Sequence, residues 1–243
     1  MEGEVTIEQW SYIIGLFHGD GHMRKSPQNG GRVRIELAQR DRDIIDVLEH
    51  LLPYKSTVYD VNRNIDVMIA GRVHVNGRSS TVCLEMYMME ARDAFFKLGM
   101  PYGAKSWTVE PPDWDYSRVD YIRGLVDADG SLGVTSKGFP FLSLTTASEA
   151  IRDEFSGFIE EYTGVKKAVN RNKRDNIYNI SVFCEDAQKL IALLYYDGSV
   201  ALDRKRRASI EAAKWVRPPG SKRKFNRQTW SEEDNEVVLN NSV

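Results

Sequence analysis

The sequence predicts an α+β protein of two similar halves, related by a pseudo-twofold axis and each with the element order αββαββα. Three observations lead to this fold class. First, a nine-residue pattern occurs twice, as Ile13–Gly21 and Ile122–Gly130. Second, each copy is followed by the same order of strand-like and helix-like segments, which gives each half a four-stranded antiparallel sheet. Third, small residues recur four positions apart in both copies, as in two helices that pack closely together.

Both copies of the pattern end an amphipathic helix at a carboxylate. Small residues share one face of each helix: Gly15 and Gly19 in the first, Gly124 and Ala128 in the second. A helix face without larger side chains lets another backbone approach closely. We therefore expect the two motif helices to pair along these faces, which brings Asp20 and Asp129 side by side. Gly21 and Gly130 suit the position that stops a helix.

The first half begins with the capping sequence Thr6-Ile7-Glu8-Gln9. Between Arg32 and Gln39 apolar and polar residues alternate, which indicates a strand with one buried face. A long segment that contains Gly71 and Gly77 joins the last two strands and can form a ribbon of its own. The expected elements are a helix to Gly19, strands at 22–26 and 32–39, a helix at 41–52, strands at 56–61 and 80–86, and a helix at 91–98.

The second half repeats this order and ends in an additional helix. A turn at Lys137-Gly138 joins its first strand pair, and Ser148 caps the following helix. The expected elements are a helix at 119–128, strands at 130–135 and 139–146, a helix at 148–161, strands at 165–170 and 177–183, and helices at 186–195 and 204–215. We divide the chain into a first half at 1–103, a linker at 104–115, a second half at 116–216 and a tail at 217–243, basic and then acidic.

Composition excludes several classes of protein. The chain of 243 residues has a net charge of −2, which by itself does not indicate nucleic-acid binding, but basic residues cluster at 165–174, 203–207 and 217–227. Cys83 and Cys184 have no Cys or His neighbours at ligand spacing, so no zinc site is expected. No apolar run reaches membrane length, and the acidic first residues are unlike a signal or transit peptide. We expect an intracellular, cytoplasmic protein from a bacterial, archaeal or phage gene, with no membrane partner.

The two motifs resemble those of the LAGLIDADG family of homing endonucleases, in its single-chain form with two motifs. The second copy, residues 122–130, follows the family pattern at nearly every position. The first departs at its sixth position, where His18 replaces Asp and either packs, caps or tunes the adjacent ligand. The eighth position, the family's metal ligand, is an aspartate in both copies, Asp20 and Asp129. The resemblance implies a monomer whose two sheets form a saddle and lie in successive segments of the DNA major groove.

Two carboxylates that meet at a helix seam repel each other unless a cation lies between them. Hard divalent ions suit such a site, Mg²⁺ above all, with Mn²⁺ as a substitute and Ca²⁺ as an ion that binds without supporting cleavage. The expected ligands are the side chains of Asp20 and Asp129 and the backbone carbonyls of Gly19 and Ala128. A metal held between carboxylates can activate water and stabilise charge on a phosphate.

The family resemblance also implies basic and solvent-orienting residues near each scissile phosphate. Lys105 and Lys205 occupy matching places near the end of each half, where family members carry a basic residue that activates water or stabilises charge. Gln39, at the end of a strand, matches a family position that orients solvent, and its counterpart in the second half is Thr146. The predicted catalytic residues are Asp20, Asp129, Lys105, Lys205 and Gln39.

Polar side chains on the outward faces of both sheets are expected to contact double-stranded DNA, at bases or phosphates. In the first half these residues are Arg24, Arg32, Arg34 and Glu36. In the second half they are Ser143, Thr145, Lys167, Arg171, Lys173, Asn179 and Ser181. Lys167, Arg171 and Lys173 are expected on a strand that faces the groove.

These residues indicate a sequence-specific, metal-dependent endonuclease that hydrolyses phosphodiester bonds in both strands of a long, pseudo-symmetric DNA site. By resemblance, it would cut across the minor groove and leave short 3′ overhangs. The alternative is a binder without cleavage activity on the same scaffold, either an intron RNA maturase or a transcription regulator. The presence of both motif aspartates favours the enzyme, because a binder has no need of two adjacent carboxylates.

Overall fold

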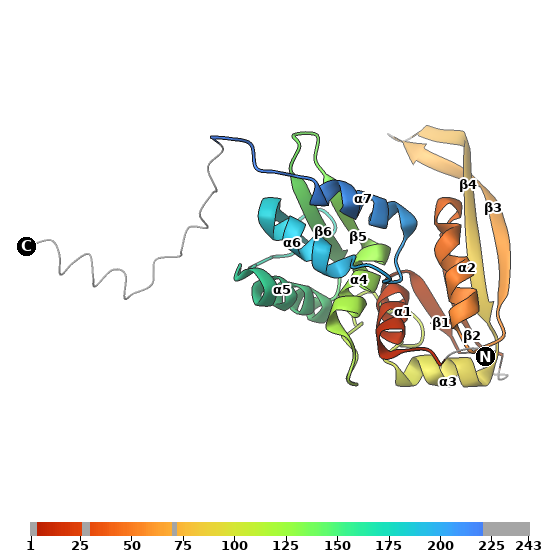
Figure 1. Cartoon of the computed structure of the whole chain (residues 1–243). Coiled ribbons are helices and arrows are strands. Elements are labelled where there is room, and N and C mark those ends of the chain that lie inside the picture. The colour runs from red at the N-terminus through yellow and green to blue at the C-terminus, as the bar shows by residue number, and fades with distance from the viewer. Residues whose placement is uncertain (1–3, 26–29, 70–71, 221–243) are drawn as a thin grey trace, which may run out of the picture.

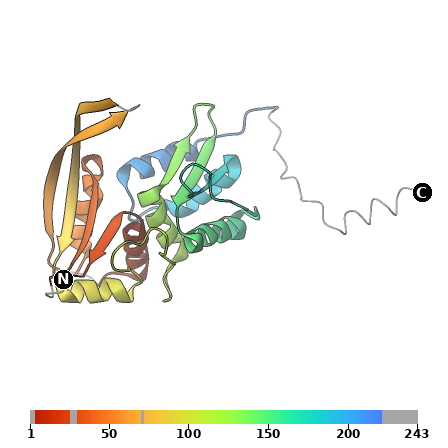
Figure 2. The same ribbon diagram turned by 180° about the vertical axis from the view of Figure 1, so that it is seen from behind.

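The computed structural model describes residues 4–25, 30–69 and 72–220, which form two α+β halves packed through their motif helices (Figure 1). Helix α1 (Ile7–Asp20) opens the first half, and α4 (Arg118–Asp129) opens the second. The two helices lie side by side in the middle of the molecule, with one sheet on either side of the pair (Figure 2). Most of the predicted tail, residues 221–243, lies outside the described ranges.

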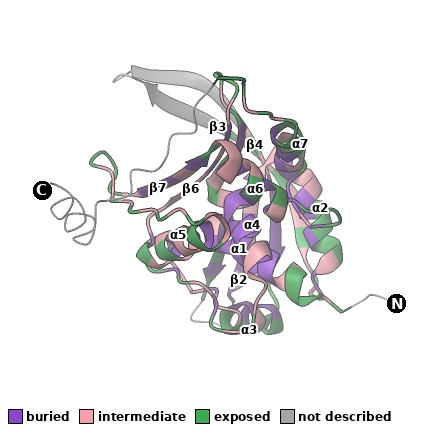
Figure 3. Ribbon diagram, turned by 60° about the vertical axis from the view of Figure 1, so that its left-hand side comes forward, coloured by how far each residue is buried: buried purple, intermediate pink, exposed green. Residues whose placement is uncertain are grey.

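The close approach of α1 and α4 follows from the glycines on their shared face. A Cβ atom built on Gly15 would lie 2.2 Å from the backbone oxygen of Tyr121, and one built on Gly124 would lie 2.2 Å from that of Tyr12. No side chain fits at either position, because both distances are far shorter than any van der Waals contact of carbon with oxygen. Residues 11–18 of α1 and 120–127 of α4 are all buried (Figure 3). The predicted pairing of the motif helices is confirmed.

The first half has the predicted order αββαββα. Thr6 and Gln9 form the predicted capping box at the start of α1. The remaining elements are β1 (Gly21–Arg24), β2 (Arg32–Ala38), a 3-10 turn η1 (Gln39–Asp41), α2 (Arg42–Leu51), β3 (Thr57–Ile69), β4 (Arg72–Met86) and α3 (Met89–Lys97). Its antiparallel sheet has the order β1-β2-β4-β3. Strands β3 and β4 are longer than predicted, because they continue into the two-stranded ribbon expected of the segment between them.

The second half departs from the predicted order, because one of its four predicted strands is absent. Its elements are α4, β5 (Gly130–Val134), β6 (Pro140–Thr146), α5 (Glu149–Thr163), β7 (Tyr178–Phe183), α6 (Cys184–Leu194) and α7 (Asp203–Ala213). In the described part of this half the sheet has three antiparallel strands in the order β5-β6-β7. The segment 165–170 shows the alternating burial of a strand, with Val165 and Val169 packed on the core, but it does not join the sheet. Side-chain alternation alone therefore does not establish backbone pairing.

The linker packs against both halves near the ends of the motif helices. The indole nitrogen of Trp114 donates to the backbone oxygen of Leu98 at 3.1 Å. The hydroxyl of Ser148, at the start of α5, donates to the backbone oxygen of Val109 at 2.6 Å. Residues 104–115 are thus held in place between the halves. None of the helices in the three described ranges is long and apolar enough to cross a membrane.

Candidate active site

Asp20 and Asp129 lie together at the C-terminal ends of α1 and α4. A Cβ atom built on Gly19 would lie 2.2 Å from the Cβ of Ala128 and 3.1 Å from Oδ2 of Asp129. Each aspartate keeps an exposed side, yet the protein around it disfavours its charged form. Partial burial, and then the negative charge of Asp129, raises the pKa of Asp20 to about 6. Partial burial also raises the pKa of Asp129.

Lys105, which belongs to the linker, lies beside both carboxylates. It is buried, and its Nζ donates to the backbone oxygen of Gly19 at 2.7 Å. Burial lowers the pKa of Lys105, although the charges of Asp129 and Asp20 act in the opposite direction. The positive charge of Lys105 in turn lowers the pKa of both aspartates. The predicted position of this lysine next to the motif helices agrees with the structure.

Lys205 occupies the equivalent place in the second half, in the first turn of α7. Its Nζ donates to the backbone oxygens of Asp127 at 2.8 Å and Gly130 at 3.0 Å, and also to that of Val126. Burial lowers the pKa of Lys205 to about 8, against the opposing effect of the Asp127 charge. Both lysines therefore satisfy carbonyl groups at the end of a motif helix, where a cation is also favoured by the helix dipole.

The oxygen-rich end of the paired helices fits a hard divalent cation. No three His, Cys, Asp or Glu side chains come together in the described ranges, so such an ion would take its protein ligands from Asp20, Asp129 and backbone carbonyls. Burial is the first cause of the raised pKa of both carboxylates, and the charge of Asp129 adds to it for Asp20, so a cation bound here would favour their charged forms. Of the two predicted carbonyl ligands, that of Gly19 already accepts from Lys105. Lys205 binds carbonyls on either side of the other, Ala128.

Gln39 lies in the 3-10 turn that directly follows β2. Its amide nitrogen donates to Oδ1 of Asp60 at 3.4 Å, and Arg42 binds the same oxygen atom at 2.5 Å. These bonds direct the amide toward β3. A solvent-orienting role for Gln39 stays a prediction that requires the amide to leave Asp60.

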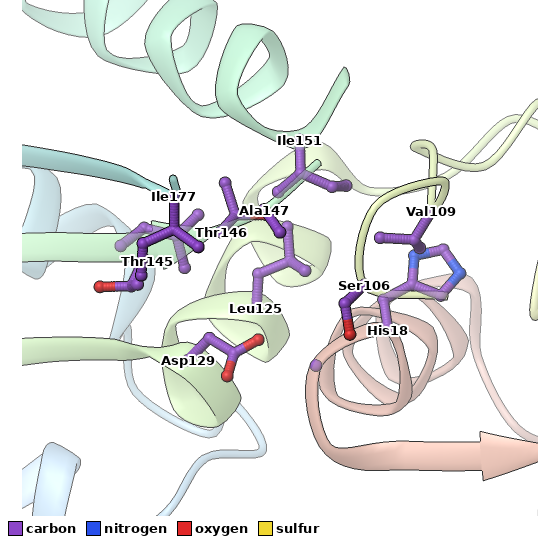
Figure 4. Close-up of a pocket in the computed structure, with 12 residues that line it drawn as sticks. His18, Ser106, Val109, Leu125, Asp129, Thr145, Thr146, Ala147, Ile151 and Ile177 are labelled. Atoms are coloured by element: carbon purple, nitrogen blue, oxygen red, sulfur yellow. The ribbon is translucent and has the colours of Figure 1, made fainter. Parts of the chain in front are cut away.

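A pocket of about 200 Å³ opens beside Asp129 (Figure 4). Asp129 and Ser106 point into it from opposite sides, and Leu125 forms part of its apolar wall. Thr146, the counterpart of Gln39, lines the same pocket next to Thr145. The second-half carboxylate therefore borders a partly enclosed space, shaped jointly by the linker and β6.

The outward face of the first sheet is a network of arginines and glutamates. Arg32, Arg34 and Glu36 alternate with buried residues along β2, as predicted. Glu85 of β4 lies on this face but is only 1% exposed, because the guanidinium groups of Arg32 and Arg34 cover it at 3.1 and 3.4 Å. Glu36 accepts from Arg63 of β3 at 2.6 Å. The sequence prediction missed Glu85 and Arg63, although their strands pair directly with each other.

Arg24 and His22 extend this charged face along β1. Arg24 is exposed and lies opposite Arg32 in the strand pair, and His22 lies opposite Arg34. Partial burial, and then the charge of Lys105, lowers the pKa of His22. The positive charges of Arg32, Arg34 and Arg24 act on His22 in the same direction.

The outward face of the second sheet is uncharged. Ser131, Ser143 and Ser181 lie in register across its three strands. The hydroxyl of Thr145 donates to Oδ1 of Asn179 at 3.0 Å in the next row. Ser143, Thr145, Asn179 and Ser181 thus share the face on which they were predicted.

The predicted strand placement of Lys167, Arg171 and Lys173 is wrong. Lys167 lies with Val165 and Val169 on the half-buried side, and burial lowers its pKa. The guanidinium of Arg171 donates to two backbone oxygens at 3.0 and 2.9 Å and stacks over the Tyr178 ring at 4.3 Å. Lys173 lies in an exposed turn. These bonds hold Arg171 in the structure of the second half, and DNA contacts by the three residues stay predictions.

Comparison with known proteins identifies the family of the chain. A profile described as "LAGLIDADG-like domain" matches residues 8–67 and 118–192. The chain belongs to the LAGLIDADG family. The profile match confirms the resemblance stated from the two motifs. A search of curated proteins finds no match.

Solved structures with the same fold include several homing endonucleases. I-DmoI in complex with DNA and Ca superposes with a TM-score of 0.56 at 15% identity, over 85% of this chain and 98% of that chain. I-WcaI bound to its DNA recognition sequence gives a TM-score of 0.53 at 15% identity, over 85% and 88%. I-LtrWI bound to target DNA gives 0.50 at 12% identity, over 83% and 87%. At these identities the likeness establishes a shared fold, the scaffold on which those DNA endonucleases are built.

Proposed function

We propose that this chain is a sequence-specific endonuclease that hydrolyses both strands of a long, pseudo-symmetric DNA duplex with a divalent cation, Mg²⁺ by preference. The pairing of α1 and α4 carries this proposal, because it brings two carboxylates and two buried lysines to one place. Both aspartates have raised pKa values there. Such perturbed groups in one cluster are typical of a reactive site rather than of a binding surface alone.

The duplication supplies one aspartate, one lysine and one sheet for each strand of a duplex. Since both motifs lie in one chain, the protein would act as a monomer. The two sheets would lie in neighbouring segments of the major groove, where outward side chains reach base edges and phosphates. The I-DmoI and I-WcaI structures, whose fold this chain shares, contain DNA, which supports DNA as the partner.

Phosphodiester hydrolysis needs an attacking water, stabilisation of negative charge and a proton for the leaving oxygen. Asp20 and Asp129 would hold the cation, which supplies positive charge to the phosphate and favours deprotonation of the attacking water. Lys105 and Lys205 are fixed by carbonyl bonds and would place their positive charge near the phosphate. With a pKa of about 8, the amine of Lys205 exchanges its proton close to neutral pH, which suits proton transfer to the leaving oxygen.

The decisive experiment is cleavage of a library of duplexes with randomised sequence by the purified chain, with Mg²⁺, Mn²⁺, Ca²⁺ or a chelator. We expect enrichment of one long, roughly symmetric site among the molecules cut in Mg²⁺. Retention of the same site without cutting is expected in Ca²⁺, and no cutting with the chelator. Binding of one duplex or of structured RNA without cleavage in either Mg²⁺ or Mn²⁺ would favour the binder on the same scaffold instead.

A further inference from the structure

The sixth residue of each motif is buried and has no place in the chemistry proposed above. His18 is 3% exposed in the first motif, and Asp127 is 1% exposed in the second. The two residues occupy equivalent positions but differ in hydrogen-bonding capacity. A carboxylate only accepts hydrogen bonds, whereas a neutral imidazole donates one and accepts one.

Asp127 binds the segment that delivers Lys205. Its carboxylate accepts from the backbone N–H of Leu202 at 2.8 Å and from the hydroxyl of Tyr195 at 2.7 Å. Leu202 immediately precedes α7, whose first turn contains Lys205. The bond to Leu202 therefore fixes where α7 begins and how its lysine reaches the end of α4.

His18 makes the corresponding bond in the first half. Its Nε2 lies 3.0 Å from the backbone oxygen of Gly99, and its Nδ1 lies 2.9 Å from the hydroxyl oxygen of Tyr121. Because a carbonyl oxygen only accepts, Nε2 carries the proton and Nδ1 accepts from Tyr121. Gly99 follows α3, has a φ of +100° and leads into the chain toward Lys105.

Each sixth residue also reaches the other motif helix. Tyr121 of α4 contacts His18, and Tyr12 of α1 donates to Asp127 at 2.9 Å. Both tyrosines lie three positions before the first glycine of their motif. The links thus cross the helix seam in both directions and obey the pseudo-twofold symmetry, although the two sixth residues differ.

Resting on the proposed function, we propose that His18 and Asp127 are positioning residues, each of which fastens the chain segment that carries the lysine of its own half. The residue type follows from the backbone group it holds. Leu202 presents an N–H and needs an acceptor, whereas Gly99 presents a carbonyl and needs a donor. An aspartate at position 18 would direct an acceptor at the carbonyl of Gly99 and leave that carbonyl without its partner. The departure of the first motif from the family pattern is therefore a requirement of this chain.

The first test measures how readily each lysine reacts with an amine-acetylating reagent, by mass spectrometry, in the protein without DNA. His18→Asp should raise the reaction rate of Lys105 by about tenfold, the effect of losing one buried hydrogen bond, and leave that of Lys205 unchanged. Asp127→Asn should do the reverse, because its amide group can no longer accept from all three donors. His18→Gln, which keeps a donor and an acceptor, should react like the wild type.

The second test is strand-resolved, single-turnover cleavage of the duplex that the wild type selects. His18→Asp should slow cleavage of the same DNA strand that Lys105→Met affects. The expected loss is about 100-fold, for a displacement of Lys105 on the order of an ångström, and DNA affinity should be unchanged. Should His18→Asp fail to fold, His18→Met removes the donor at similar volume and is compared with His18→Gln. The proposal would be overturned if His18→Gln and His18→Met slowed cleavage equally, or if His18→Asp raised the acetylation rates of both lysines equally. Either result would mean that the sixth residue only packs in the core. If the wild type cuts no duplex, the proposed function fails, whereas the acetylation test still decides the role of the sixth residue.

Discussion

The two sheets present different chemistry, although one helix pair holds both of them. On the first sheet, arginine side chains form ion pairs with glutamates. Arg32 and Arg34 bind Glu85 and cover it from solvent. On the second sheet, serine, threonine and asparagine side chains form the corresponding rows, as in the register of Ser131 with Ser143. The first sheet offers long charged groups held by acids, and the second offers short neutral ones together with the Phe141–Phe183 pair. Under the proposed function, a duplicated scaffold would keep one reaction centre while its two surfaces suit unlike half-sites.

If the two halves share one chemistry and differ only in DNA recognition, Asp20 and Asp129 should be equally important for cleavage. Asp20→Asn and Asp129→Asn should each reduce double-strand cleavage by about 1,000-fold or more, since a metal-assisted reaction loses several kcal/mol of transition-state stabilisation without its ligands. DNA affinity should persist in both variants. Gel-based cleavage and binding assays measure the two effects, with Asp93→Asn, exposed on α3, as the matched control. If either variant cleaved at the wild-type rate, the two aspartates would not have equivalent roles.

The lysines should affect rate rather than affinity, with a difference between the halves. Lys105→Met and Lys205→Met should each slow single-turnover cleavage by about 100-fold, the usual range for a positioned proton-transfer group. Because the pKa of Lys205 is about 8, cleavage limited by its charged form should decline as the pH rises through 8, and Lys205→Met should lose this decline. Rate profiles between pH 6 and 10 provide the measurement. A weakened affinity with an unchanged rate would make both lysines phosphate anchors.

The sheet faces should respond differently to salt. Arg24→Gln removes an exposed charge from the first sheet and should lower the log–log salt slope of DNA binding by about one unit. Ser143→Ala on the second sheet should leave that slope unchanged and alter sequence preference instead. Binding titrations at several salt concentrations distinguish the two. Equal slopes in both variants would remove the contrast between the faces.

The smallest expected effect concerns stability in the absence of metal. The pKa of Asp20 is raised from 3.8 to about 6 on folding, so its contribution to stability is fully present below pH 3.8 and is lost as the pH rises through 6. Asp20→Asn should therefore stabilise the metal-free protein at pH 7 by about 1 kcal/mol, after allowance for the exposure of the side chain, and by nothing at pH 3.5. Urea denaturation at both pH values checks this, and a destabilised variant at pH 7 would show that the folded protein does not disfavour the charged form of Asp20.

The helix pair could be predicted because its signal is local. Glycine four residues from glycine or alanine places small residues on one helix face, and the contacts of Gly15 and Gly124 bear this out. The missing strand could not be predicted in the same way. Residues 165–170 alternate as a strand does, but pairing depends on whether another backbone lies alongside. That alternation did contain a usable signal, since it places Lys167 with Val165 and Val169 on the half-buried side.

The sequence predicted which residues form the candidate site, but not the hydrogen bonds that hold them in place. Asp20 and Asp129 follow from the repeat, and both lysines from their matching places. The bonds of His18 and Asp127 could not be predicted, because their partners Gly99 and Leu202 come from distant segments. A carbonyl at one position and an N–H at the other become visible only when the tertiary structure is known.

A crystal structure of the protein with its selected duplex and Mn²⁺ would test the proposed reaction centre most directly. Anomalous scattering locates Mn²⁺ without reference to the surrounding atoms. We predict an anomalous peak between Asp20 and Asp129, within coordination distance of both carboxylates and of a phosphate in each strand. Cut DNA with no peak at this place, or with Mn²⁺ held by other residues, would contradict the assignment of the paired motif aspartates as the metal site.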